Sequence, residues 1–253
     1  MTEFCADIDK LFTELPFEQR FKAAKSAGFS SVEFVMPEKM PLGKLGDLCA
    51  VDGLKPAMIS LSDEQARLAY DAHAFDAFCE LFEKVAETAD FVEAPFIHIP
   101  AIDVADDKLD DAQAALADSL DEAAEIVKSY RKKILLGFKN PVENPQAYPS
   151  SISELLEILD EYDDDSTFGL MLDLYETQTS EGGLSDALEK LMQFIGHIRI
   201  AGVPLRNEPD DGEVNYTYLL ALLEAHGYAH AVSASYTPRA KTQTGLKWMK
   251  KFL

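Results

Sequence analysis

Short apolar segments alternate eight times with longer, helix-patterned segments along this 253-residue chain. Strands that alternate with helices form βα units, and the strands of such units lie parallel in one sheet. Eight units close into a (β/α)8 barrel, and about 250 residues is the usual length of that fold. The sequence therefore predicts an α/β protein with a single (β/α)8 TIM barrel over residues 1–253.

The expected elements follow from hydrophobic periodicity and from the Gly and Pro residues between them. The predicted strands cover Phe4–Ala6, Ser31–Met36, Pro56–Leu61, Ala94–Ile99, Lys133–Phe138, Phe168–Asp173, His197–Ala201 and His230–Ser235. The predicted helices cover Phe17–Ala27, Lys44–Val51, Asp63–Ala89, Asp107–Tyr130, Ser151–Tyr162, Leu184–Phe194, Tyr216–Ala225 and Lys241–Phe252. A break is expected near Tyr70–His73, and Ser151 with Glu154 forms a capping-box pattern.

The charge balance excludes several classes of partner. The chain has 45 acidic and 23 basic residues, which gives a net charge of −22. Such a surface repels phosphate backbones and anionic lipids, so we expect no nucleic-acid partner and no membrane partner. No apolar run approaches the roughly 18 residues of a membrane helix. The oligomeric state does not follow from the sequence.

The N-terminus and the cysteines indicate a compartment. The first ten residues have no basic region followed by an apolar one, so we expect no signal peptide here. Cys5, Cys49 and Cys79 lie far apart without a CxxC motif, which argues against a disulfide framework and against a zinc site. We therefore expect a protein of the reducing cytoplasm.

The segment from Ile195 to Tyr216 comprises a strand, a polar loop and the start of a helix. Its pattern G-H-x-x-I-A, followed by P-x-R-x-E-P-x-x-G-E-x-N-Y, resembles the hydroxypyruvate isomerase family among the sugar isomerase/epimerase barrels. Four further fragments resemble the same family in the same order, and they are Val32–Pro37, Met171–Tyr175, Ser235–Pro238 and Thr244–Met249. The segment from Ser62 to Ala101 matches that family poorly.

The resemblance implies a divalent metal at the barrel mouth, held by Glu, Asp, His or Gln, and Glu from strands five to eight. Those two glutamates also move the substrate proton, and the metal polarises the carbonyl. Asp173 matches the aspartate, whereas Lys139, Arg199 and Ser235 stand at the other three positions. In the third strand, Ser60 falls within a pair that replaces the family's His-Asn.

Strand alternation gives Lys139, Asp173, Arg199 and Ser235 the same inward direction. We therefore expect two cations around one carboxylate at the mouth. Charged Lys and Arg side chains have no lone pair to donate to a metal. The sequence predicts neither a bound metal nor another cofactor.

The candidate site residues fall into two groups. We assign catalytic roles to Glu33, Lys139, Asp173 and Arg199, and substrate-binding roles to His98, His197, Arg206, Ser235 and Tyr236. Lys139 and Arg199 are suited to an anionic or sugar-like ligand, and Lys139 is also a candidate for a Schiff base. His197 could instead be a hydrogen-bonded histidine of the barrel interior. Arg206 could instead form a salt bridge within its loop.

Three functions stay open. In the first, the barrel has lost the metal-dependent isomerase reaction and retains a pocket for a small anion. In the second, it is a metal-independent isomerase or epimerase, in which Lys139 and Arg199 stabilise an enediolate while Glu33 or His98 moves the proton. In the third, it is a structural or interaction protein whose mouth is filled by a Lys139–Asp173–Arg199 network.

Overall fold

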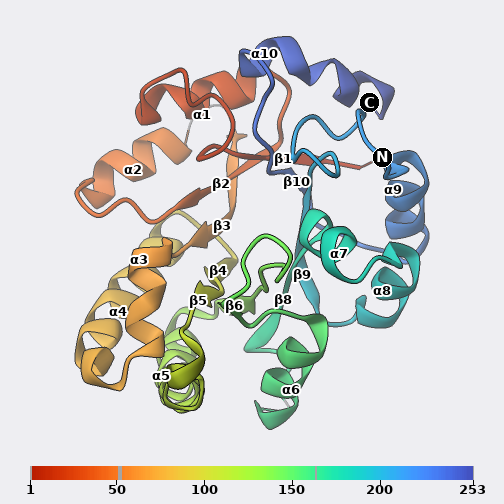
Figure 1. Ribbon diagram of the computed structural model, residues 1–253. Helices are drawn as coiled ribbons and strands as arrows, with labels where there is room; N and C mark the ends of the chain where they lie inside the picture. Colours follow the sequence, from red (N-terminus) through yellow and green to blue (C-terminus); the bar gives the residue numbers. More distant parts are fainter. Residues whose placement is uncertain (1, 51–52, 163, 253) are drawn as a thin grey trace.

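The structure, a computed structural model, describes residues 2–50, 53–162 and 164–252. Parallel strands form a closed barrel in the order β1-β10-β9-β8-β6-β4-β3-β2 (Figure 1). They cover β1 Phe4–Asp7, β2 Ser31–Val35, β3 Lys55–Ser60, β4 Phe96–Ile99, β6 Lys133–Leu136, β8 Phe168–Asp173, β9 Ile195–Ile200 and β10 Val232–Ala234. The predicted (β/α)8 barrel is confirmed.

Helices surround these strands as an outer ring (Figure 1). The α-helices are α1 Phe17–Ser26, α2 Leu42–Cys49, α3 Asp63–Ala66, α4 Phe75–Phe91, α5 Leu109–Tyr130, α6 Ile152–Tyr162, α7 Leu174–Ser180, α8 Leu184–Leu191, α9 Tyr216–Ala225 and α10 Thr242–Gly245. The described residues also form the 3-10 helices η2 Arg67–Tyr70, η3 Ala72–Ala74, η4 Asp106–Lys108 and η5 Leu246–Lys251. The break expected near Tyr70–His73 lies between η2 and η3. Val51, the predicted end of the second helix, lies outside the described residues.

Two features differ from the predicted elements. The short strands β5 (Ile102–Asp103) and β7 (Ala147–Tyr148) form an antiparallel pair outside the barrel. Helix α7 follows β8 directly, with Asp173 as both the last strand residue and the N-cap. Asp173 is a preferred N-cap residue, but without Gly or Pro before α7, and with only seven residues in it, the sequence pattern did not separate this helix from the strand.

The strands bury apolar side chains on their outer faces against the helices. Ile97, Leu136, Leu170 and Ile198 are buried members of this large core. Their neighbours along each strand point into the barrel, since successive side chains alternate between the two faces. Burial on both faces explains why β4, β6 and β8 are largely apolar in sequence.

The barrel interior holds an apolar cluster on one side and mainly polar side chains on the other. Met58, Phe96, Leu135 and Met171, from β3, β4, β6 and β8, form a small separate apolar cluster. Glycines make room beside this cluster, because a Cβ at Gly196 would lie 2.6 Å from Leu135 Cδ2. Strands β1, β2, β9 and β10 instead bury polar side chains, namely Cys5, Asp7, Ser31, Glu33, His197, Ser233 and the neighbouring Ser235.

The two ends of the described chain pack together. The ring of Phe4 in β1 contacts the ring of Trp248 in η5 edge-on, with 5.1 Å between centroids. Trp248 also contacts Tyr236, which follows β10. The C-terminal segment therefore covers the seam where the first and last strands pair. Within the described residues, none of the helices combines the length and apolar character needed to cross a membrane.

Candidate functional site

A cavity of about 570 Å³ opens where the barrel strands end at their carboxyl sides. Six of the predicted site residues line it: His98, Lys139, Asp173, Arg199, Arg206 and Ser235. Glu33, His197 and Tyr236 are not among its lining residues. The structure thus brings most of the predicted residues together at the C-terminal mouth, where a barrel of this kind holds its active site.

Glu33 is buried beneath the cavity and holds Arg199. The Arg199 Nε donates to Glu33 Oε1 at 2.8 Å, and His197 Nε2 lies 2.5 Å from Glu33 Oε2. Burial opposes ionisation of Glu33, but Arg199 and His197 outweigh it and lower the pKa of this carboxyl to about 2. Glu33 therefore remains a fixed counter-ion. Across the described part of the chain, no hydrogen bond occupies the terminal Nη atoms of Arg199, whose side chain lines the cavity.

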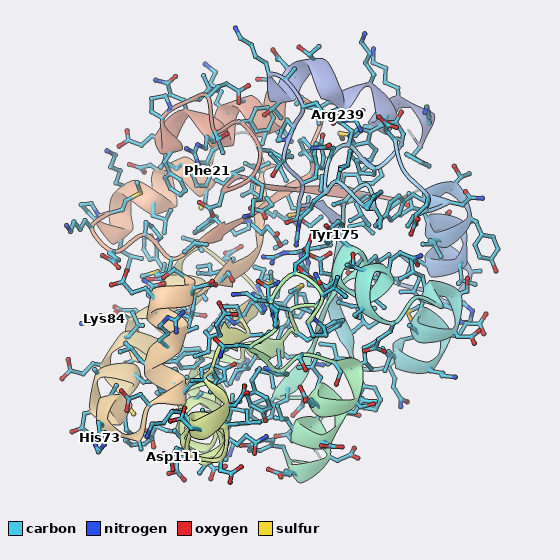
Figure 2. The ribbon with its side chains drawn as sticks, viewed as in Figure 1. Phe21, His73, Lys84, Asp111, Tyr175 and Arg239 are labelled. Carbon is cyan, nitrogen blue, oxygen red and sulfur yellow. The ribbon has the colours of Figure 1, made fainter. Side chains whose placement is uncertain are left out.

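Asp173 pairs with Arg206, where we had expected Lys139 and Arg199 around it. Asp173 Oδ2 accepts from Arg206 Nη2 at 2.6 Å, and Asp173 Oδ1 accepts from the backbone N–H of Tyr175 at 2.9 Å. Arg206 also pairs with Glu176, and its guanidinium lies 4.6 Å from the centre of the Tyr175 ring. Tyr175, central in Figure 2, thus belongs to the wall that holds Arg206. Arg206 therefore forms salt bridges from its loop, which was the alternative to a substrate-binding role.

Lys139 reaches the rim of the cavity. Its Nζ lies 2.7 Å from Asp63 Oδ2, and that aspartate is largely exposed. The glycine two positions earlier, Gly137, also lines the cavity and approaches the opposite side chains closely. A Cβ at Gly137 would lie 2.9 Å from His98 Nε2 and 2.7 Å from Met171 Cε. The end of β6 therefore contributes an ammonium group at the rim and no carboxylate.

His98 lines the cavity and has one ring nitrogen without a hydrogen-bond partner among the described residues. Its Nδ1 lies 2.7 Å from Ser60 Oγ, and Ser60 Oγ itself donates to the carbonyl of Leu61 at 3.3 Å. Ser60 must then accept the Nδ1 proton, which leaves the lone pair on Nε2. This Nε2 is buried and has no partner among the described residues. Burial, and then the charge of Arg199, hold the pKa of His98 well below its usual range, so the ring is neutral.

Asp7 is a cavity residue that the sequence analysis missed. Ser235 Oγ donates to Asp7 Oδ2 at 2.7 Å, and the backbone N–H of Asp9 donates to Asp7 Oδ1 at 3.0 Å. Burial, followed by the charge of Glu33, raises the pKa of Asp7 to about 6. The signal was present: Asp7 has the inward parity of Cys5, but the predicted strand ended one residue too early.

The remaining predicted residues lie away from the cavity. Tyr236 is fully buried, and its hydroxyl accepts from Trp248 Nε1 at 3.1 Å. His197 is fully buried beside Glu33. This position matches the alternative that His197 is an interior histidine and not a substrate-binding residue. Neither side chain can touch a ligand in the cavity without a rearrangement of the barrel interior.

The residues at the mouth do not fit a divalent metal. Both oxygens of Asp173 are engaged, Lys139 and Arg199 are donors only, and the hydroxyl of Ser235 donates to Asp7. Deeper in the barrel, ligand atoms of Cys5, Glu33 and His197 lie within 4.8 Å of one another. There the direct 2.5 Å contact between His197 and Glu33 leaves no gap for an ion between them.

Comparisons with known proteins agree with this architecture. A family model described as xylose isomerase-like TIM barrel matches residues 21–252. A 2-oxo-tetronate isomerase of Haemophilus influenzae is 31% identical over 259 residues, covering 100% of both chains. The hydroxypyruvate isomerase of Escherichia coli is 26% identical over 260 residues, covering 98% of each.

Solved structures show the same fold. A crystal structure described as an AP endonuclease, family 2, from Brucella melitensis superposes with a TM-score of 0.90 at 25% identity, covering 100% of this chain and 99% of that one. An apo 3-keto-D-glucoside 4-epimerase from E. coli superposes with a TM-score of 0.83 at 18% identity, covering 99% and 100%. The ordered motifs, the closed eight-stranded barrel and these matches lead to one conclusion: the chain belongs to the xylose isomerase-like TIM-barrel family, among its hydroxypyruvate isomerase-like members.

Proposed function

We propose that the barrel mouth binds a small hydroxy-carbonyl acid through cationic side chains, in place of a resident divalent metal. The observation that carries this proposal is the orientation of Arg199. Glu33 engages its Nε, while its terminal nitrogens are unengaged within the described residues and belong to a side chain that lines the cavity. A guanidinium held in this way is preorganised for bidentate contact with a carboxylate.

The other groups of the cavity match the remaining parts of such a ligand. The Lys139 ammonium at the rim supplies a second positive charge. His98 lines the same cavity with a neutral ring, which suits a substrate hydroxyl. Relatives named 2-oxo-tetronate isomerase and hydroxypyruvate isomerase support a hydroxylated 2-oxo acid as the ligand class.

Metal-independent isomerisation of the same acid is a second candidate. Positioned cations stabilise an enediolate oxyanion electrostatically, which is the contribution otherwise supplied by a metal. Of the two proton-moving groups considered from sequence, Glu33 is held as a buried carboxylate, whereas His98 faces the cavity. The open cavity of about 570 Å³ argues against the third hypothesis, a structural protein with a filled mouth.

Charge and cysteine state support the remaining proposals about partners and location. A net charge of −22 disfavours a nucleic-acid ligand, even though one structural relative is described as an AP endonuclease. Cys5, Cys49 and Cys79 are free thiols, which fits the proposed cytoplasmic location.

Titration calorimetry with hydroxypyruvate and with 2-oxo-tetronate tests the binding proposal. We expect binding that is unchanged by EDTA and weakened at least about tenfold by Arg199→Lys, which keeps a charge beside Glu33 but loses the planar fork. Lys139→Ala should also weaken binding. Lys108→Ala is the control, because Lys108 forms only an exposed pair with Asp111. Equal affinity in wild type, Arg199→Lys and Lys139→Ala would refute the proposal.

A further inference from the structure

We propose that Asp7 is the general base of this site, the group that removes and returns the carbon-bound proton of a hydroxy-carbonyl acid. This inference rests on the proposed function, because it requires that such an acid binds in the cavity. It adds a catalytic residue that neither the sequence motifs nor the resemblance to the family indicated. Three observations support it: the position of Asp7, its lack of an ion pair, and its hydrogen bonds.

The barrel topology places Asp7 at the mouth. It is the last residue of β1, and it lines the cavity together with Ser235 and Arg199. In the sheet, Asp7 is the register partner of Glu33 on β2, while Ala6 pairs with Ala234 on β10. Its side chain therefore lies where the first and last strands meet, at the level of Ser235.

Asp7 differs from the other buried carboxylates that line the cavity. Asp173 and Glu176 both pair with Arg206, so their charges are neutralised. Asp7 forms no ion pair within the described residues, and its partners are the Ser235 hydroxyl and the Asp9 N–H. A buried carboxylate without a cationic partner costs free energy, so its retention at a cavity wall points to a chemical role.

The surrounding charges set the basicity of Asp7. Burial is the largest influence, and the charge of Glu33 on β2 and of Asp9 on the following loop act in the same direction. Arg199 on β9 and the hydroxyl of Ser235 after β10 act against it. The net result raises the pKa of Asp7 to about 6, so the group is ionised at neutral pH yet more basic than an ordinary aspartate.

The proposed reaction balances without a co-reactant. The Asp7 carboxylate takes the proton from the hydroxymethyl carbon of hydroxypyruvate, and the electron pair of that C–H bond forms the C=C bond of an enediolate. The carbonyl oxygen receives the displaced pair beside Arg199. The hydroxyl proton then passes to that oxygen next to His98 Nε2, and Asp7 returns its proton to the former carbonyl carbon. The product is the isomeric hydroxy aldehyde acid.

Exchange of the C3 protons of hydroxypyruvate in D₂O, followed by proton NMR, tests this step without requiring full turnover. With wild-type protein and EDTA present, we expect exchange above the buffer rate that rises with pH through about 6. Asp7→Asn keeps an acceptor for Ser235 but cannot take a proton, so exchange should fall at least about 100-fold. Asp111→Asn is the matched control, because Asp111 pairs with Lys108 at the surface and does not line the cavity, so exchange should be unchanged.

Calorimetry on the same samples separates the two proposals. Wild-type binding without exchange, or exchange by Asp7→Asn at the wild-type rate, overturns the role of Asp7 and leaves the binding pocket intact. Absence of wild-type binding overturns the proposed function, and the role of Asp7 with it. Thermal melting of Asp7→Asn establishes that the variant is folded.

Ser235 acts in this scheme as a positioning residue through its hydrogen bond to Asp7. Because that bond favours the ionised carboxylate, Ser235→Ala should move the pH at which exchange is half-maximal upwards. A merely structural role would change the rate at every pH equally. An unshifted profile in Ser235→Ala would exclude the proposed contact between Ser235 and the base.

Discussion

The guanidinium of Arg206 bonds to Asp173 across 2.6 Å, from a loop residue to the end of a barrel strand. Asp173 is almost fully buried, whereas Arg206 is about 29% exposed in its side chain. The pair means that the chain itself neutralises the one carboxylate that matched the family's metal ligands. It also ties the loop after β9 to the floor of the mouth.

Removing Arg206 should destabilise the protein strongly. Arg206→Ala leaves two buried carboxylates, Asp173 and Glu176, without a counter-charge, so we expect a loss of about 3 kcal/mol in the free energy of unfolding at pH 7. Urea denaturation measures this loss. Arg239→Ala is the control, because Arg239 pairs with Asp211 at the surface and should cost no more than about 1 kcal/mol. Equal losses in the two variants would contradict the buried role of Arg206.

Glu33 should stabilise the fold in a pH-dependent way. Its pKa falls from 4.5 to about 2 on folding, so its contribution is present above about pH 4.5 and is lost as the pH drops towards 2. At 1.36 kcal/mol per pKa unit, the contribution at pH 7 is about 3 kcal/mol. Glu33→Gln should lose this contribution, and the difference in free energy of unfolding between wild type and variant should shrink below pH 4.5. Urea denaturation at several pH values measures this difference. If the difference does not change with pH, the ionised Glu33 carboxylate is not its source.

Asp7→Asn should have the opposite effect on stability. The pKa of Asp7 rises from 3.8 to about 6 on folding, so ionisation destabilises the native protein as the pH increases through this range. The amide avoids that cost, and the variant should be more stable than wild type by up to about 3 kcal/mol above pH 6. Below pH 3.8 the two proteins should be equally stable. Thermal melts across pH 4 to 8 check this, and a destabilised variant above pH 6 would count against the pKa shift.

Divalent metals should not stabilise the wild-type protein through the mouth. A metal present at about 100 times its dissociation constant would add about 2.7 kcal/mol, or several degrees in melting temperature. We expect no such shift with Mg²⁺, Mn²⁺ or Co²⁺, since Lys139 and Arg199 offer no lone pair and Asp173 is engaged. A shift of several degrees that disappears in Asp173→Asn would overturn this prediction.

Sequence alone predicted the barrel because the strand signal is physical and local. Segments buried on both faces are largely apolar, and the loops between them carry Gly and Pro, so eight units could be counted without knowledge of their contacts. The same alternation predicted that Lys139, Asp173, Arg199 and Ser235 would reach one mouth, and all four line the cavity.

The pairing of charges could not be predicted in the same way. Arg206 reaches Asp173 because the loop after β9 bends back, with Arg206 itself in the left-handed backbone region at φ 51°. Lys139 turns to Asp63, which belongs to α3, the helix after β3 and within the segment that resembles the family least. Such partners depend on loop paths, for which a strand pattern carries no information.

The hydrogen bond between Ser235 and Asp7 joins residues 228 positions apart, across the seam closed by β1 and β10. During synthesis, β1 emerges long before β10 has been made. Asp7 on β1 therefore cannot bond to Ser235 until almost the whole chain has been synthesised. A nascent chain that stops before Ser235 would hold His98, Asp173 and Arg199 but could not complete the wall beside Asp7. The proton transfer proposed for Asp7 would therefore be possible only after the ribosome has released the last strand. Truncated chains that end before Ser235 would lack this activity.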